Sequence, residues 1–307
     1  MAPDEDGAAD VTSLRFGLVG TGYWARVTHA PALASVDGVE LAAVWGRSRT
    51  RAAELAARYD AAAYDNVDAF LTDVDAVAFA VPPDVQAGIA VRAADAGKHL
   101  LLEKPVAISD QEADALVSAI DRAGVASVVF FTARFQPDVR RWLAGVAGRT
   151  GWMGGTGAWL SKALDESSPF NTPWRREKGG LWDIAPHLVS LLWASLGPVT
   201  SVTADAGLAD ITHLVLHHDS GATSTATVTL STPAKAAGAE LYLWGESGRS
   251  AAPLHTGDPV SALRTALAEL VVNARAGKVS HPCDARFGRD VVRVLADAQR
   301  QLDTRRE

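Results

Sequence analysis

The sequence predicts an α/β protein with an N-terminal doubly wound parallel sheet and a second, α+β domain built on a mainly antiparallel sheet. Through residue 131, short apolar runs alternate with helical patterns, which is typical of a parallel sheet covered on both faces. Beyond Pro137, segments rich in Thr, Val and Ala alternate with a period of two. We predict a disordered tail at residues 1–13, a first domain at 14–125 and a second at 126–307.

The composition excludes several classes of protein. Of the 307 residues, 48% are hydrophobic and 21% are charged, as in soluble globular proteins. The net charge is −7 and the basic residues are scattered, which argues against nucleic acid or a membrane surface as a partner. Cys283 is the only cysteine, which excludes an intrachain disulfide and favours a cytoplasmic location. The sequence shows no signal peptide and no apolar stretch of the ~20 residues that a membrane helix needs.

A glycine-rich turn follows the first predicted strand. Residues 14–19 run directly into Gly20, Gly22 and Ala25, the pattern GxGxxA, and residues 23–35 have a helical pattern. The glycines let the backbone turn tightly and approach a pyrophosphate, and a small third residue lets the helix pack on the strand. We therefore predict a dinucleotide site, with contacts from Gly20, Thr21, Gly22, Tyr23 and Trp24.

The residues after the second predicted strand bear on the choice of cofactor. This strand, residues 40–45, precedes a helix with Ser48 as its predicted N-cap. NAD enzymes usually place Asp or Glu at the strand's end, where it binds the ribose 2′-hydroxyl. Here Gly46, Arg47, Ser48 and Arg49 follow the strand, and two arginines suit a 2′-phosphate. We predict NADP, bound by Gly46, Arg47 and Ser48, with NAD as the alternative because the arginines also fit a solvated helix start.

Three more strands complete the predicted parallel sheet. Residues 74–81 form a buried strand that ends at Pro82 and Pro83, which stop it and rigidify the loop. Val81 and Pro82 are therefore predicted beside the cofactor. The remaining predicted elements are helices at 84–96 and 110–123 and strands at 99–102 and 126–131.

Lys104 stands at the carboxyl end of the strand at 99–102, in the stretch KHLLLEKP. Open α/β sheets hold their ligands at this end. An amine there is an anchor for a phosphate or substrate, or a proton-transfer group whose pKa burial lowers. The alternative is a solvated loop lysine.

Three motifs resemble the Gfo/Idh/MocA oxidoreductase family: GTGYWA, AGKHLLLEKP and FFTARFQP. EKP is the specific element, because GxGxxA is shared by many unrelated proteins. The resemblance implies a Rossmann domain followed by a domain for substrate binding and oligomerisation, with Glu103 and Lys104 near the nicotinamide and the substrate. It also implies a homo-oligomer, either a dimer or a tetramer, joined through an exposed face of the second sheet.

Asp183 and His187 are four residues apart in GGLWDIAPHLVSLLWASLG, which places them on one face of a helix that begins near Asp183. A carboxylate beside an imidazole fixes its tautomer and favours its protonated form. The alternative is an exposed pair without a role. The family's DxGxH element matches here, with Ala185 in place of the glycine.

Several other residues are weaker candidates. Arg134 and Arg175 are predicted substrate contacts; Arg175 and Arg176 lie in SPFNTPWRREKGG, interpreted as a long loop. Gln86 stands where many family members carry His or Asn. Three histidines and three tryptophans are expected to be structural residues, and we predict no metal site at the histidines. They are His213, His217 and His218, and Trp159, Trp174 and Trp182.

These features lead to one principal hypothesis. It is an NAD(P)-dependent oxidoreductase that transfers a hydride between nicotinamide and a secondary alcohol or ketone of a sugar, cyclitol or related polyol. Lys104 and His187 are the candidate acid/base groups, with Asp183 orienting His187 or holding a substrate hydroxyl. The alternative is a non-catalytic dinucleotide-binding regulator or scaffold, and a biliverdin-type reductase or an eliminating glycosidase would also fit the fold.

Overall fold

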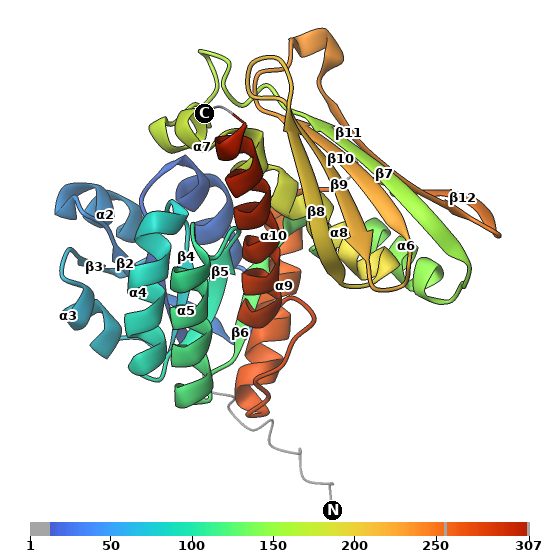
Figure 1. The fold of residues 1–307 in the computed structure, drawn as a ribbon. Helices are drawn as coiled ribbons and strands as arrows, with labels where there is room; N and C mark the ends of the chain where they lie inside the picture. The colour runs from blue at the N-terminus through green and yellow to red at the C-terminus, as the bar shows by residue number, and fades with distance from the viewer. Residues whose placement is uncertain (1–12, 255–256, 306–307) are drawn as a thin grey trace, which may run out of the picture.

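The computed structural model describes residues 13–254 and 257–305 and contains both predicted sheets (Figure 1). Apart from Ser13, the predicted tail lies outside the described residues. The first sheet is parallel with the order β3-β2-β1-β4-β5-β6, so the strand order reverses beside β1, as in doubly wound folds. Its strands are β1 (Leu14–Val19), β2 (Val39–Trp45), β3 (Ala62–Tyr64), β4 (Ala76–Phe79), β5 (His99–Glu103) and β6 (Ser127–Phe130).

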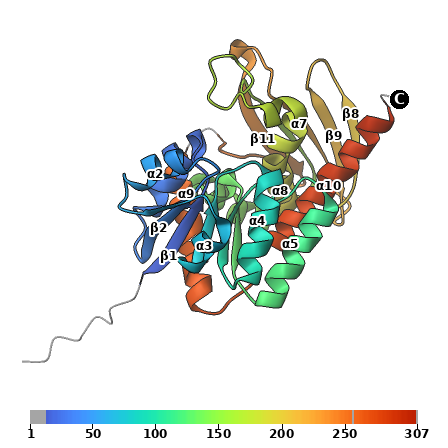
Figure 2. The same ribbon diagram turned by 90° about the vertical axis from the view of Figure 1, so that its left-hand side faces the viewer.

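Helices cover both faces of the first sheet. Figure 2 shows α4 (Pro83–Asp95) and α5 (Asp110–Ala123) in front of the sheet and α9 (Pro259–Arg275) behind it. Ser48 accepts a hydrogen bond from the Arg51 N–H at the start of α2 (Arg49–Ala56), which confirms it as an N-cap. The short helices are α1 (Ala30–Leu33), α3 (Val67–Thr72), η1 (Ala25–His29) and η2 (Thr132–Phe135). The helix predicted at 23–35 is therefore present but irregular, because η1 is a π-helical turn.

The second sheet is mainly antiparallel, as predicted, with the order β12-β11-β7-β10-β9-β8 and one parallel pair, β7 with β10. α8 (Ala185–Leu196) packs on its inner face, where Gly155 and Gly157 leave room for the side chains of Leu192 and Leu188. The opposite face exposes alternate side chains of β9 and β10. The strands are β7 (Trp152–Leu160), β8 (Val199–Ala206), β9 (Thr212–His218), β10 (Thr223–Thr229), β11 (Gly238–Gly245) and β12 (Gly248–Ala251).

The C-terminal helix joins the two units. α10 (Ala285–Thr304) packs against α5 and against β8 (Figure 2). Gln301 accepts a hydrogen bond from the Ala204 N–H at 3.0 Å and donates to the Val202 carbonyl at 2.8 Å. β6 follows residue 125 and still pairs with β5, so the first sheet extends past the predicted domain boundary.

The interpretation of residues 168–180 as a long loop is wrong in its second half. α7 (Pro173–Asp183) begins there, with Pro173 at a position where a missing N–H costs nothing. Gly179 interrupts this helix with φ +63°, a left-handed conformation that glycine adopts without strain. The remaining helices of this unit are α6 (Pro137–Ala147), which follows η2, and the short η3 (Ala234–Ala236). Among the described helices, none is long and apolar enough to cross a membrane.

Candidate active site

The glycine-rich turn joins β1 to the helix that follows, at the edge where the strand order reverses. Gly20 has φ +127°, and a Cβ there would lie 2.5 Å from the carbonyl oxygen of Ala80, so only glycine fits this turn. Gly22 is different, because it is exposed and a Cβ there would meet no protein atom within 4 Å. A ligand can therefore approach its backbone closely, which is what a dinucleotide pyrophosphate requires. The turn fits this group.

The residues after β2 lie next to this turn. A Cβ on Gly46 would lie 2.8 Å from Cγ2 of Thr21, which brings the two segments together. Arg49 pairs with Asp65 at 3.4 Å. Arg47 is exposed, and its guanidinium has no hydrogen bond or ion pair with the described residues. Of the two predicted arginines, Arg47 is therefore the one with its charge available.

Lys104 leaves the end of β5 and reaches the second unit. Its ammonium donates to the backbone carbonyl of Asp183 at 2.6 Å and to Oδ1 of the same residue at 2.9 Å. Arg175, on α7, donates from Nε to the other oxygen, Oδ2, at 2.7 Å. The Asp183 side chain is only 6% exposed and the Lys104 side chain 10%. The alternative of a solvated loop lysine is therefore wrong.

Asp183 is ionised in this arrangement. Burial opposes the charged form and would raise its pKa, but Lys104 and Arg175 outweigh burial and hold the pKa below the ordinary range. Both carboxylate oxygens are engaged by these two cations. Asp183 thus fixes the position of the Lys104 ammonium.

His187 lies on α8 and does not pair with Asp183, contrary to the expectation from their spacing. Asp183 ends α7 and precedes the first turn of α8, so the two residues do not share one regular helix. The imidazole stacks on Trp159 with ring centroids 5.1 Å apart, and its buried Nδ1 has no hydrogen-bond partner in the part of the chain that the structure describes. Burial and the nearby Lys104 lower the pKa of His187 well below its usual value. The imidazole is therefore neutral, and the expected protonated form is wrong.

Glu103 and Gln86 brace the chain beside Lys104. Glu103 Oε1 accepts from Nε1 of Trp24 at 2.7 Å and lies 2.9 Å from Nε2 of His29. Gln86 is fully buried, donates to the Glu103 carbonyl at 2.8 Å and accepts from the Glu103 N–H at 2.8 Å. The amide of Gln86 is thus occupied by the backbone of the Lys104 segment, which is a positioning role and not a ligand contact.

The segment before α7 reaches the glycine-rich turn. The Phe170 ring packs edge-on against Tyr23 and Trp24, with centroids 5.4 and 5.8 Å apart. The Arg175 guanidinium lies 5.3 Å from the centroid of the same ring. Phe170 therefore links the predicted cofactor turn to the Lys104–Asp183 pair. Phe170 was not predicted as a site residue, because a single aromatic residue between two prolines is not specific to any function.

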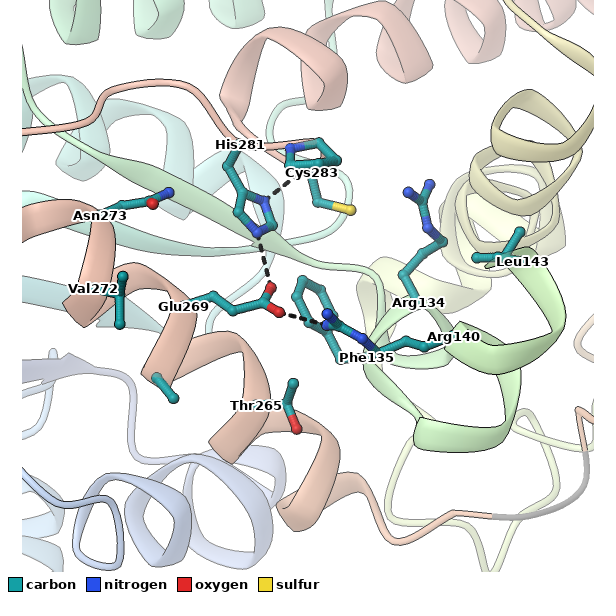
Figure 3. A pocket seen from close by; sticks show the side chains of 12 residues that line it. Arg134, Phe135, Arg140, Leu143, Thr265, Glu269, Val272, Asn273, His281 and Cys283 are labelled. Carbon is teal, nitrogen blue, oxygen red and sulfur yellow. Dashed lines mark hydrogen bonds and ion pairs between the residues drawn. The ribbon is translucent and has the colours of Figure 1, made fainter. Parts of the chain in front are cut away.

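Other predicted residues lie elsewhere. Arg134 donates to the Ser190 carbonyl at 2.9 Å and lines a separate cavity, shown in Figure 3, whose lining contains none of Lys104, Asp183 and His187. Arg176 donates to the Asn171 side chain. Val81 and Pro82 lie at the exit of β4, where Val81 would contact a Cβ on Gly20.

The three histidines named above and Trp182 have hydrogen-bond partners, whereas Trp159 and Trp174 lie beside residues of the site. His213 and His217 lie within hydrogen-bond distance of threonines on β10, and His218 of Gly197 and Ser224. The Trp182 indole donates to Gln299, and Trp159 faces His187. The Arg175 guanidinium lies 5.7 Å from the centroid of the Trp174 ring, whose Nε1 has no hydrogen-bond partner among the described residues. Within residues 13–254 and 257–305, no group of three or more His, Cys, Asp or Glu side chains has the arrangement of a metal site.

Comparison with known proteins places this site in a family. The protein-family model for "Oxidoreductase family, NAD-binding Rossmann fold" matches residues 14–131. The family model for "GFO/IDH/MocA C-terminal domain" matches residues 123–250. The two matches together span both sheets as far as β12. The chain therefore belongs to the Gfo/Idh/MocA family of oxidoreductases.

Individual relatives agree with this assignment. The UDP-N-acetylglucosamine 3-dehydrogenase of Acidithiobacillus ferrooxidans is 34% identical over 41% of this chain and 40% of its own length. The D-xylose 1-dehydrogenase (NADP(+)) 2 of Haloferax volcanii is 30% identical over 72% of this chain and 70% of its own length. The chain thus spans 40% of the length of the UDP-N-acetylglucosamine 3-dehydrogenase that it matches. The crystal structure of GenD2 from gentamicin A biosynthesis, in complex with NAD, has a TM-score of 0.82 at 22% identity, covers 98% of this chain and 97% of its own, and shares the fold.

Proposed function

We propose that this protein is an NADP-dependent dehydrogenase acting on a secondary alcohol of a sugar, cyclitol or related polyol. One observation carries the proposal: an ammonium fixed by a buried carboxylate lies close to a neutral imidazole without a hydrogen-bond partner at Nδ1, beside a turn shaped for a dinucleotide. This combination supplies both a charged anchor for an oxygen and an acceptor for its proton.

The residues divide the chemistry of alcohol oxidation between them. The bound cofactor would take up the hydride that leaves the substrate carbon. Lys104 would donate a hydrogen bond to the substrate oxygen and stabilise its developing negative charge. His187, being neutral, would accept the hydroxyl proton at a ring nitrogen, and the C–O bond would become a carbonyl. Asp183 and Arg175 would hold Lys104 in position, and in ketone reduction each step runs backwards.

The substrate class and the cofactor rest on different observations. Relatives named for UDP-N-acetylglucosamine and D-xylose support a sugar or related polyol. NADP is supported by Arg47, which lies just after β2 and whose charge has no partner within residues 13–254 and 257–305. A dehydrogenase is favoured over the regulator or scaffold because Lys104, Asp183 and His187 come together in one buried place, a set of acid/base groups that dinucleotide binding alone does not need.

We also propose a homo-oligomer in the cytoplasm. The exposed face of the second sheet commonly joins subunits in the family, and the single cysteine, Cys283, suits a reducing compartment.

Calorimetric titration with NADPH and NADH tests the proposal. We expect wild-type protein to bind NADPH more tightly than NADH. Arg47→Met should weaken NADPH binding by about tenfold or more and leave NADH binding unchanged, because a charge-assisted contact is lost. Arg49→Met is the matched control and should have little effect, since Arg49 is already paired with Asp65. Equal binding of both cofactors by wild type and Arg47→Met would contradict the NADP assignment, and binding of neither would contradict the dehydrogenase.

A further inference from the structure

A cavity of about 730 Å³ lies apart from the Lys104 site, between α9, the segment η2 to α6, and the chain that enters α10. This is within the ~300–1,000 Å³ of small-molecule sites. Its wall combines apolar side chains, among them Phe135, Leu143 and Val272, with charged ones. None of the residues assigned to catalysis or cofactor binding lines it.

On one side of the cavity, the charged side chains pair with one another and leave no net charge. Glu269 lies 2.6 Å from Arg140 Nη1 and 2.9 Å from Nε2 of His281. Nδ1 of His281 accepts from the Cys283 N–H at 2.9 Å, so it carries no proton, and Nε2 is the donor to Glu269. His281 is therefore neutral. Arg140 and Glu269 cancel each other's charge.

Arg134 is the charged side chain of the cavity wall that these pairs do not neutralise. Among the described residues it has no carboxylate partner; Nη1 donates to the Ser190 carbonyl at 2.9 Å, and the guanidinium lies 5.6 Å from the Phe287 ring centroid. In Figure 3 no dashed line joins it to another drawn side chain, whereas Glu269, Arg140 and His281 are linked. Ser190 thus fixes the guanidinium in place before any ligand arrives, which reduces the entropy lost on binding.

The remaining titratable groups do not cancel this charge. Burial raises the pKa of the Cys283 thiol to about 11, so the thiol is neutral. Asp284 is next to it in the chain but pairs with Arg286 at 3.2 Å. The wall of the cavity therefore carries one net positive charge, from Arg134, beside apolar surface.

We propose that this cavity binds a small organic monoanion, with a carboxylate on Arg134 and a compact apolar body against Leu143 and Val272. A guanidinium binds a carboxylate through two parallel hydrogen bonds. A monocarboxylate matches the single net charge, whereas a phosphate ester would bring a second negative charge with no partner. The proposal does not depend on the cofactor or on turnover.

Titration of the full-length protein with sodium benzoate at constant ionic strength tests the site. We expect saturable binding and a rise in melting temperature, with benzamide, the neutral analogue, and phenyl phosphate both binding more weakly. Arg134→Met should weaken benzoate binding by about tenfold or more. Ala268→Phe should weaken it as well, because it fills the cavity without changing a charge.

Two controls locate the binding. Arg264→Met removes a cation from the same helix outside the cavity and should leave benzoate affinity unchanged. Lys104→Met should also leave it unchanged. Absence of saturable binding, equal affinity in wild type, Arg134→Met and Ala268→Phe, loss of binding in Lys104→Met, or tighter binding of phenyl phosphate would each overturn the proposal. If Arg134→Met does not fold, Ala268→Phe decides, since Arg134 is intact in it.

Discussion

Asp183 and Glu269 are each held by two nitrogen-bearing side chains, and the groups beside them are left in different states. Asp183 takes up Lys104 and Arg175, and the histidine beside it, His187, keeps a nitrogen without a partner. Glu269 binds Arg140 and Nε2 of His281, and Nδ1 of that histidine accepts from the Cys283 N–H, so both of its nitrogens have partners. There the group without a carboxylate is an arginine, Arg134.

This difference decides what each of two regions can do. The first region is the cluster around Asp183, and the second is the cluster around Glu269. A neutral imidazole with a free nitrogen can exchange a proton, which suits catalysis. Both ring nitrogens of His281 already have partners, so neither is free for a substrate, and the arginine beside it, Arg134, is suited to binding an anion. The first region is therefore equipped for a reaction, and the second for binding alone.

The largest expected effect is on turnover. Lys104→Met should lower turnover on a sugar or polyol substrate by ~10²- to 10⁴-fold while leaving cofactor affinity nearly intact, because it removes the group that stabilises charge on the substrate oxygen. Steady-state kinetics alongside cofactor titration measures both. Lys162→Met, at an exposed lysine, is the control. Full turnover in Lys104→Met would end the catalytic interpretation of the first region.

Asp183→Asn should have the next largest effect, on stability. It leaves two cations facing a neutral amide in a buried site, which costs about 3–5 kcal/mol in the free energy of unfolding. Asp65→Asn, in the exposed pair with Arg49, should change stability little. Urea denaturation of the three proteins gives the comparison. Similar losses for both variants would mean that the Asp183 cluster contributes no more than a surface pair.

His187 should make the stability of the protein depend on pH. The folded-state pKa of His187 lies below its unfolded value of ~6.5, so the unfolded chain binds the proton first and stability falls as pH decreases below about 6.5. The slope from this group is at most about 1.4 kcal/mol per pH unit. His187→Phe should reduce the loss between pH 7 and pH 5. Unfolding curves at several pH values that are parallel for wild type and variant would contradict a neutral buried His187.

The smallest expected effect concerns the second region. Glu269 is partly exposed, so Glu269→Gln should destabilise the protein by only about 1 kcal/mol. It also removes the negative charge that offsets Arg140, so benzoate should bind several-fold more tightly. Glu240→Gln, on the exposed face of β11, is the control. Unchanged benzoate affinity in Glu269→Gln would show that the cavity does not sense this charge.

Much of the first unit was predictable because its signals are local. Alternating apolar runs and helices specify a parallel sheet, and the Gly20 turn follows from backbone geometry within a few residues. The position of Lys104 at the end of β5 follows from the same pattern. The stretch at 259–275 was not predicted as a helix, and the short β3 and α3 offer too few residues for a period to be recognised.

The sequence by itself determined which chemical groups stand at the carboxyl ends of the strands, whereas the tertiary structure decided which of them meet. Asp183 is four residues from His187, yet it binds Lys104, which is 79 residues away, because the packing of the second unit on the first brings the two together. Arg134 follows β6 closely and nevertheless points into another cavity, toward Ser190. Contacts of this kind depend on how whole elements pack, and no local pattern encodes that packing.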